Sequence, residues 1–173
     1  LALGFAPARP AAAAAMPPDD APFWTGRPDS AAFEARQRKR IELAKAAVAK
    51  MLAVKGPRTI ENTLVPYDEA LRQLDMAGSQ ASLVENTSPD RATRSAGEKL
   101  GQDVAAYFTE LSLNRKVYDA LAALDVSKAD GATRHYVTRT LRDFRLSGVD
   151  KDDATRAKIK KASDEVVAVG QEF

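Results

Sequence analysis

Apolar residues recur at three- and four-residue steps through most of the chain after residue 28, and this spacing predicts a succession of helices. The first helix is predicted to begin after a cap at Asp29 or Ser30 and to end near Lys55, because Gly56 and Pro57 follow. Its apolar stripe consists of Phe33, Ile41, Ala44, Val48, Met51 and Leu52. Its opposite face carries the cations Arg36, Arg38, Lys39, Arg40, Lys45 and Lys50.

A proline places the start of the second helix. Pro66 would break a helix interior, so it belongs in the first turn, with Asn62 or Thr63 as the cap. The pattern then continues weakly across Gly78 to about Glu85. A narrow apolar seam suited to helix packing is formed by Leu64, Tyr67, Leu71 and Leu74.

The third and fourth helices each have a start signal. Ser88, Pro89 and Asp90 supply a cap, a proline at the first position and an acid in the first turn. The stripe of this third helix is Ala92, Ala96, Leu100, Val104, Phe108 and Leu111. Asn114 caps a short fourth helix, and a polar turn over residues 127–131 follows it. The stripe of the fourth helix is Val117, Leu121 and Leu124.

A sharp corner between two helices is predicted near residue 148. The fifth helix stops at Gly148, which can adopt the left-handed backbone conformation that ends a helix. Arg142 and Arg145 lie in its last turn, where the helix dipole favours cations. The apolar positions of this helix are Val137, Leu141 and Phe144.

The sixth helix is predicted to start from Asp150 as its cap, with Asp152 and Asp153 in the first turn. Val149 and Ala154 are spaced for a hydrophobic staple across that cap. The stripe is Ile159, Ala162, Val166, Val169 and Phe173. This pattern reaches the last residue without a cap or polar tail. We expect later helices of a longer protein to cover part of it, and without them the end should fray or pair with a second copy.

The fold class predicted from these periods is all-α, with about six helices, because no window alternates convincingly with a period of two. The chain divides into residues 1–27 and residues 28–173. The first part is predicted to be an extended arm in which the aromatic pair Phe23 and Trp24 is best suited to docking. The second part is the helical region.

The first residues also bear on localisation. The segment LALGFAPARPAAAAA is similar to the tail of a secretory signal, with small residues suited to cleavage between Ala11 and Ala15, although Arg9 interrupts the apolar run. On that interpretation residues 1–27 hold a signal remnant, and the protein is secreted or periplasmic. If Met16 is the true start instead, the protein is cytoplasmic.

Composition narrows the possible partners. Lys and Arg total 26 against 24 Asp and Glu, and a net charge of only +2 argues against nucleic acid as the main partner. The absence of cysteine excludes a disulfide, a thiolate nucleophile and a cysteine-bound metal. No stretch approaches the roughly 20 apolar residues that span a bilayer, so membrane insertion is not predicted.

The single histidine, His135, is a weak candidate for catalysis. It could pair with Asp130 or Asp143, but Asp143 is two helical turns away, and no residues supply a nucleophile and oxyanion donors together. A surface histidine is therefore the favoured interpretation. One histidine cannot build a His-Glu-x-x-His zinc site, and no glycine-rich phosphate loop is present. We therefore predict no catalytic, cofactor-binding or metal-binding residue in this chain.

The arginines of the fifth helix could instead mark a nucleic-acid surface. They spiral round the helix, and no aromatic platform for stacking accompanies them. A solvated face paired with acids on neighbouring helices is therefore favoured, and the cations of the first helix receive the same interpretation. The arginines are Arg134, Arg139, Arg142 and Arg145.

Three blocks of the sequence resemble the N-terminal helical region of the thimet oligopeptidase family of zinc metallopeptidases, which includes neurolysin and bacterial oligopeptidases. In chain order they are GPRTIENTLVPYDEALRQLD, ELSLNRKVYDALAAL and RTLRDFRLSGVDKDDATRAKIKKASDEVVAVGQEF. The resemblance covers about Pro28 to Phe173. One departure is Lys151, where family members tend to have leucine just after the corner. This difference concerns which subfamily the chain resembles, not the family itself.

This resemblance implies a parent protein that is almost wholly helical, with two lobes flanking a channel that admits only short peptides. It implies that zinc is held by a His-Glu-x-x-His motif and a later glutamate, all beyond the matched region. No catalytic or metal position is therefore transferred to this chain, which would form scaffold and channel wall and bind no zinc alone. The alternative is a self-contained helical interaction module, with a nucleic-acid binder the weakest hypothesis.

Overall fold

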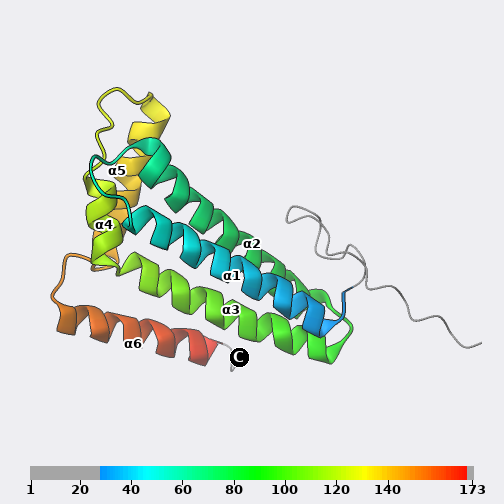
Figure 1. Cartoon of the computed structure of the whole chain (residues 1–173). Coiled ribbons are helices and arrows are strands. Elements are labelled where there is room, and N and C mark those ends of the chain that lie inside the picture. Colours follow the sequence, from blue (N-terminus) through cyan, green and yellow to red (C-terminus); the bar gives the residue numbers. More distant parts are fainter. Residues whose placement is uncertain (1–27, 171–173) are drawn as a thin grey trace, which may run out of the picture.

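The computed structural model describes residues 28–170, which form six α-helices without a strand, so the all-α prediction is confirmed for them (Figure 1). The helices are α1 (Ser30–Leu52), α2 (Val65–Thr87), α3 (Arg91–Ser112), α4 (Arg115–Ala122), α5 (Gly131–Leu146) and α6 (Asp153–Gly170). The predicted signal remnant and arm, with Phe23 and Trp24, lie outside the described residues, as does Phe173.

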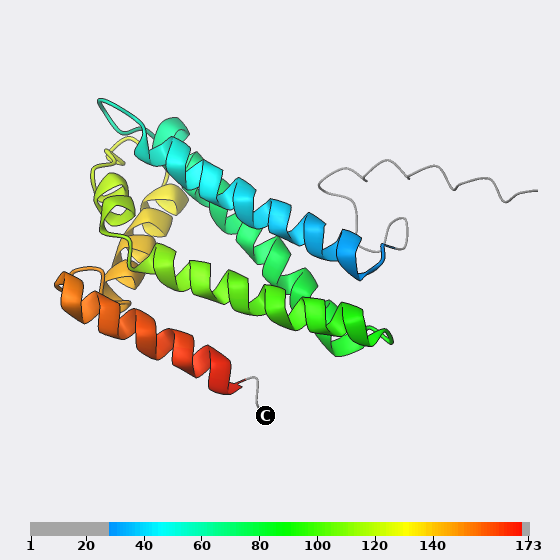
Figure 2. The ribbon, with the colours of Figure 1, turned by 60° about the horizontal axis from the view of Figure 1, so that its bottom comes forward.

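Three long helices form the body of the molecule. α1, α2 and α3 lie side by side and alternate in direction, α4 and α5 lie together at one end, and α6 returns along α3 (Figures 1 and 2). The apolar stripe of α1 is buried as predicted, with only Leu52 half-buried. The stripe of α3 is exposed at its first position, Ala92, and turns inward from Ala96 onward.

Small residues bring α2 and α3 close together. Ala77 and Ala81 of α2 are fully buried, and Gly97 of α3 lies against the backbone of α2. A Cβ atom at Gly97 would lie 2.7 Å from the carbonyl oxygen of Ala81 and 3.0 Å from the amide nitrogen of Glu85. Glycine is therefore required by the close approach of two backbones rather than by a turn.

The start of the second helix differs from the prediction. Thr59, not Asn62 or Thr63, is the cap, and it forms a reciprocal capping box with Asn62: each backbone N–H donates to the other side chain, at 2.9 and 3.2 Å. A π-helical turn over Ile60–Leu64 leads directly into α2. Pro66 does lie in the first turn of α2, as predicted.

The remaining caps are a mixture of confirmed and wrong predictions. Asp29 caps α1 by accepting from the N–H of Ala32 at 2.8 Å, and Asn114 caps α4. Asp90 caps α3, so Ser88 and Pro89 precede the helix instead of opening it. α1 ends three residues earlier than predicted, and Gly56 has a positive φ of 100° in the loop that follows.

The corner at Gly148 is confirmed. Its φ is 95°, its N–H donates to the carbonyl of Arg145 at 3.0 Å, and the N–H of Val149 donates to the carbonyl of Phe144 at 3.1 Å. These two bonds form a Schellman motif. Val149 is fully buried, whereas Ala154 is exposed, so the predicted staple between them is wrong.

α6 differs from the prediction in its cap residue and in which of its faces is packed against the rest of the protein. Asp152, not Asp150, accepts from the N–H of Thr155 at 2.9 Å. The half-buried side chains of the helix include Ile159 and Val167, and no α6 residue is buried. Val166 is 71% exposed and Val169 is 53% exposed, so the predicted stripe is not buried among the described residues.

One cation assigned to the solvated face of α1 is in the core. Arg40 is only 2% exposed and donates to the side-chain oxygen of Gln73 at 3.0 Å, and Gln73 donates to Glu69 at 2.8 Å. The assignment of Arg40 to solvent is therefore wrong. Arg38, by contrast, forms the expected ion pair across helices, at 2.9 Å from Asp103 of α3.

Candidate functional site

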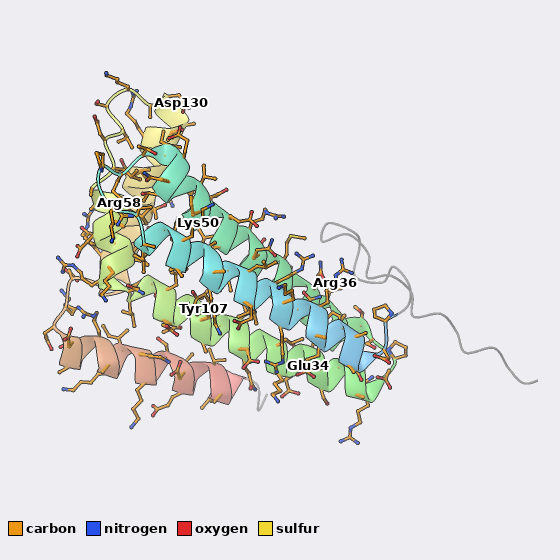
Figure 3. The ribbon with its side chains drawn as sticks, viewed as in Figure 1. Glu34, Arg36, Lys50, Arg58, Tyr107 and Asp130 are labelled. Carbon is orange, nitrogen blue, oxygen red and sulfur yellow. The ribbon has the colours of Figure 1, made fainter. Side chains whose placement is uncertain are left out.

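The groups proposed as an acid–base pair are engaged separately. His135 is exposed on α5, and Asp130 (labelled in Figure 3) caps that helix by accepting from the N–H of Thr133 at 2.7 Å. Asp143 is paired with Arg142 at 2.9 Å. Across residues 28–170, no group of three or more histidine, aspartate and glutamate side chains could hold a metal ion.

The arginines of α5 have nearer partners than predicted. Arg142 pairs with its chain neighbour, Arg134 donates to the carbonyl of Ala129 at 2.6 Å, and Arg145 donates to the hydroxyl of Tyr118 at 3.3 Å. Their expected partners were acids on neighbouring helices, and these three contacts do not fit that expectation. The basic surface of α5 is nevertheless largely solvated, because all four arginines are exposed.

The most distinctive concave surface is a hollow of about 440 Å³ between the end of α3, the start of α4 and the first turns of α6. We call it the basic hollow. It is lined by Glu110, Leu113, Asn114, Arg115, Lys116, Arg156, Ala157 and Lys160. Four of these side chains are cations, and Glu110 is the single carboxylate in the lining.

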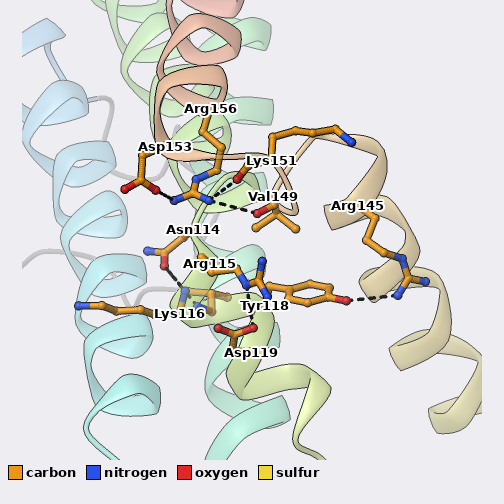
Figure 4. A network of polar contacts seen from close by, with 11 residues as sticks. Asn114, Arg115, Lys116, Tyr118, Asp119, Arg145, Val149, Lys151, Asp153 and Arg156 are labelled. Carbon is orange, nitrogen blue, oxygen red and sulfur yellow. Dashed lines mark hydrogen bonds and ion pairs between the residues drawn. The ribbon is translucent and has the colours of Figure 1, made fainter.

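The α4 side of the basic hollow is fixed by the helix start. Asn114 accepts from the N–H groups of Lys116 and Val117 at 3.1 and 3.3 Å, so the first two helical residues are Arg115 and Lys116 (Figure 4). Arg115 is held by Asp119 at 2.9 Å and lies over the ring of Tyr118, with 5.6 Å from guanidinium to ring centre.

The α6 side is fixed by the corner that precedes it. Arg156 donates to the carbonyls of Lys151 and Val149 at 2.7 and 3.4 Å and pairs with Asp153, which leaves its side chain 22% exposed (Figure 4). Lys160 pairs with Asp164 one turn later, at 2.8 Å. The turn at Gly148 therefore determines where two of the four cations lie.

A second hollow is aromatic. It measures about 300 Å³ between α2, α3 and α5, and its lining includes Tyr67, Phe108, Tyr136 and Phe144. Burial, together with nearby carboxylates, raises the pKa of Tyr67 well above its usual range, and burial also raises the pKa of Tyr136, whose hydroxyl donates to Asp68 at 3.3 Å. Both phenols are protonated at neutral pH, and Tyr136 acts as a hydrogen-bond donor.

A third hollow, of about 400 Å³ between α1, α3 and α6, has balanced charges. The basic groups are Arg38, Lys45 and Lys160, and the acidic groups are Glu42, Asp103 and Glu110. Lys45 lies over the ring of Tyr107, which Figure 3 labels on α3, with 5.7 Å to its centre. Arg38–Asp103 and Lys45–Glu42 pair internally, at 2.9 and 3.0 Å, so most of the charge is already compensated.

The histidine considered for acid–base chemistry lies outside these hollows. None of the three is lined by His135, and the serine hydroxyls in the aromatic hollow, those of Ser112 and Ser147, donate to backbone carbonyls. The four cations of the basic hollow were not predicted as a group from the sequence. The available signal was a pair of cations at the start of α4, where a helix normally favours acids.

No helix in the described part of the chain has both the length and the apolarity needed to cross a membrane. No known family model matches the chain. Among curated proteins, the chain is similar to mitochondrial intermediate peptidase 1 of Cryptococcus neoformans var. neoformans, with 27% identity over 144 residues. The match covers 79% of this chain and 19% of that protein, so the chain spans about a fifth of the length of its relative. This distant relative is a peptidase by name.

Proposed function

We propose that this chain is the N-terminal helical region of a zinc-dependent metallopeptidase that hydrolyses short peptides. The observation that carries the proposal is the similarity to mitochondrial intermediate peptidase 1, which extends over 144 residues. That protein is a peptidase by name, and we propose that it and this chain are of the metallopeptidase type of the thimet oligopeptidases. The three sequence blocks resemble the same family, and the all-helical fold agrees with it.

The proposed role of the chain is structural. Residues 28–170 do not fit a zinc site, because no three suitable ligands converge there. We therefore assign the zinc ligands and the catalytic glutamate to a segment that follows this chain, and no step of the reaction to the residues described. The long helices, closely packed where α3 meets α2 at Gly97, would support one wall of the channel that limits substrates to short peptides.

A second candidate function is a self-contained helical interaction module. The observation that favours it is the exposed apolar edge of α6, where Val166 and Val169 face solvent in the described structure. Such an edge suits a partner helix as well as it suits a later segment of the same protein. The two functions differ in one respect that an experiment can measure: only the first requires metal-dependent hydrolysis by the longer protein.

The test compares the 173-residue chain with the protein extended by its own downstream reading frame. Both are assayed with short quenched-fluorescence peptides and with casein, before and after a zinc chelator. We expect the extended protein to cleave the short peptides but not casein, to lose activity on chelation and to regain it with zinc. The shorter chain serves as the inactive control. An extended protein that folds but shows no chelator-sensitive cleavage would favour the interaction module.

A further inference from the structure

We propose that the aromatic hollow between α2, α3 and α5 binds a phenolic group, which is a neutral aromatic ring that carries a hydroxyl. The inference goes beyond the proposed peptidase function, because binding here needs neither zinc nor cleavage. It rests on two observations. One is a concave surface lined by aromatic rings, and the other is the nearly buried side chain of Tyr67, whose hydroxyl has no hydrogen-bond partner among residues 28–170.

The hydroxyl of Tyr67 is the polar group that a ligand would satisfy. Tyr67 is only 5% exposed, and its ring packs against that of Phe144, with 6.1 Å between the ring centres. Within residues 28–170 the hydroxyl forms no hydrogen bond, yet it is not one of the fully enclosed polar atoms of that region. It therefore borders open space, and the hollow that Tyr67 lines supplies that space. A ligand that accepts a hydrogen bond from this donor replaces the water that burial otherwise restricts.

The two serine hydroxyls in the lining can only accept from a ligand. Ser112 and Ser147 already donate their hydroxyl hydrogens to the backbone carbonyls of Thr109 and Asp143, both at 3.0 Å. Each serine oxygen still has a lone pair to offer. The hollow therefore combines one unused donor, on Tyr67, with acceptors elsewhere in its lining. A ligand hydroxyl matches this set because it both accepts and donates, whereas a carboxylate only accepts and an ammonium group only donates.

The lining and the size of the aromatic hollow favour an aromatic ring. Its apolar lining consists of Tyr67, Phe108, Tyr136, Phe144, Leu71 and Leu111. Aromatic rings attract one another in tilted and offset arrangements beyond the gain from burial alone. The volume is about 300 Å³, and an apolar cavity of about 150 Å³ is enough to hold benzene, so a ring and its substituents fit. The same phenol chemistry is present in a free phenol and in the tyrosine side chain of a peptide.

The test is a titration of the ¹⁵N-labelled 173-residue chain with phenol, followed through its amide signals. Parallel titrations use toluene, which lacks the hydroxyl, and cyclohexanol, which lacks the aromatic ring. We expect phenol to shift the signals of residues 67–71, 108–112 and 140–147 and to bind about threefold or more tightly than either analogue. A further titration with N-acetyltyrosinamide distinguishes the two sources. Tighter binding of this compound than of phenol supports a tyrosine side chain as the ligand, and weaker binding supports a free phenol.

Two tyrosine variants make the assignment specific. Tyr67→Phe removes only the hydroxyl, so it should weaken phenol binding about three- to tenfold, the effect of one hydrogen bond, and leave toluene binding unchanged. The variant should fold normally, because that hydroxyl forms no hydrogen bond in the described part of the chain, and a thermal melt checks this. Tyr107→Phe is the matched control. Tyr107 lies on α3 but lines the third hollow instead, so its loss of a hydroxyl should change neither affinity.

Three outcomes would overturn the proposal. The first is the absence of phenol-induced shifts around the aromatic hollow, or shifts spread evenly over the chain. The second is equal affinity of the wild-type chain for phenol and toluene, which would leave no role for the ligand hydroxyl. The third is an equal loss of phenol and toluene binding in Tyr67→Phe, which would indicate that the variant changes the shape of the hollow and not a hydrogen bond to the ligand.

Discussion

Replacing Gly97 by alanine should force α2 and α3 apart. The new methyl group would lie 2.7 Å from the carbonyl oxygen of Ala81 and 3.0 and 3.3 Å from the backbone of Glu85. These neighbours are backbone atoms inside a helix, so no side chain can rotate away to relieve the contact. The whole of α2 would have to shift relative to α3, along an interface where Val104 also lies close to Gly78 of α2.

Two opposing effects set the magnitude. Alanine gains about 1 kcal/mol over glycine in a helix interior. Overpacking a well-packed interface costs about 1–3 kcal/mol, and a clash with backbone belongs near the upper end of that range. The expected net effect of Gly97→Ala is therefore a loss of ~1–2 kcal/mol in the free energy of unfolding.

Gly101→Ala is the matched control on the same helix. It lies one turn further along α3, and a Cβ atom there would meet nothing within 4 Å. This variant should gain about 0.5–1 kcal/mol from helix propensity alone. Urea titration and thermal melting followed by circular dichroism should show opposite shifts for the two variants. Equal stabilisation by both would refute the close approach of α2 and α3 at Gly97.

Three further predictions concern the corner, the caps and the outer edge of α6. Gly148→Ala should lower the free energy of unfolding by ~1–2 kcal/mol in a urea titration, because φ at this residue is 95°. Hydrogen bonds from Thr133 and Thr155 lower the pKa values of Asp130 and Asp152, so both caps stabilise the fold at neutral pH and lose that contribution as pH falls below about 4. Thermal melts against pH should therefore fall less steeply in the double asparagine variant, and an unchanged slope would contradict this account. Val166→Asp with Val169→Asp should abolish any concentration-dependent association seen in sedimentation, and the wild-type monomer should exchange amides rapidly after about Val166.

Helix positions followed from the sequence because burial imposes a period on the chain. The stripe from Phe33 to Met51 repeats at helical spacing, and the structure buries those residues. Asp29 and Asn114 were identifiable as caps because a short polar side chain immediately precedes each apolar period. Gly148 was identifiable because glycine readily adopts the positive φ that ends a helix.

The errors have physical causes. A π-helical turn over Ile60–Leu64 precedes α2. The cap is therefore Thr59, further before Pro66 than it would be if an α-helix began directly at the proline. The helical spacing of the apolar residues of α6 defines one face of the helix, but it does not identify the neighbouring helix that packs against that face. In the structure α3 lies against the side that carries Val167, and Val166 is left exposed.

The basic hollow was beyond sequence reasoning for a different reason. Arg115 and Arg156 are separated by the rest of α4 and the whole of α5, and only the folded chain brings the starts of α4 and α6 to one surface. Each cation alone has the appearance of an ordinary solvated residue. Arg40 is the converse case, since its burial depends on Gln73 of α2, a partner that the pattern of α1 does not reveal.

The most direct test of the proposed peptidase origin is to determine the coding sequence that follows Phe173 in the same reading frame. We expect a His-Glu-x-x-His motif with a later glutamate, on a predicted helix well beyond the region that matches mitochondrial intermediate peptidase 1. A stop codon directly after Phe173, or a long downstream frame without that motif, would contradict the proposal that this chain supports a zinc peptidase.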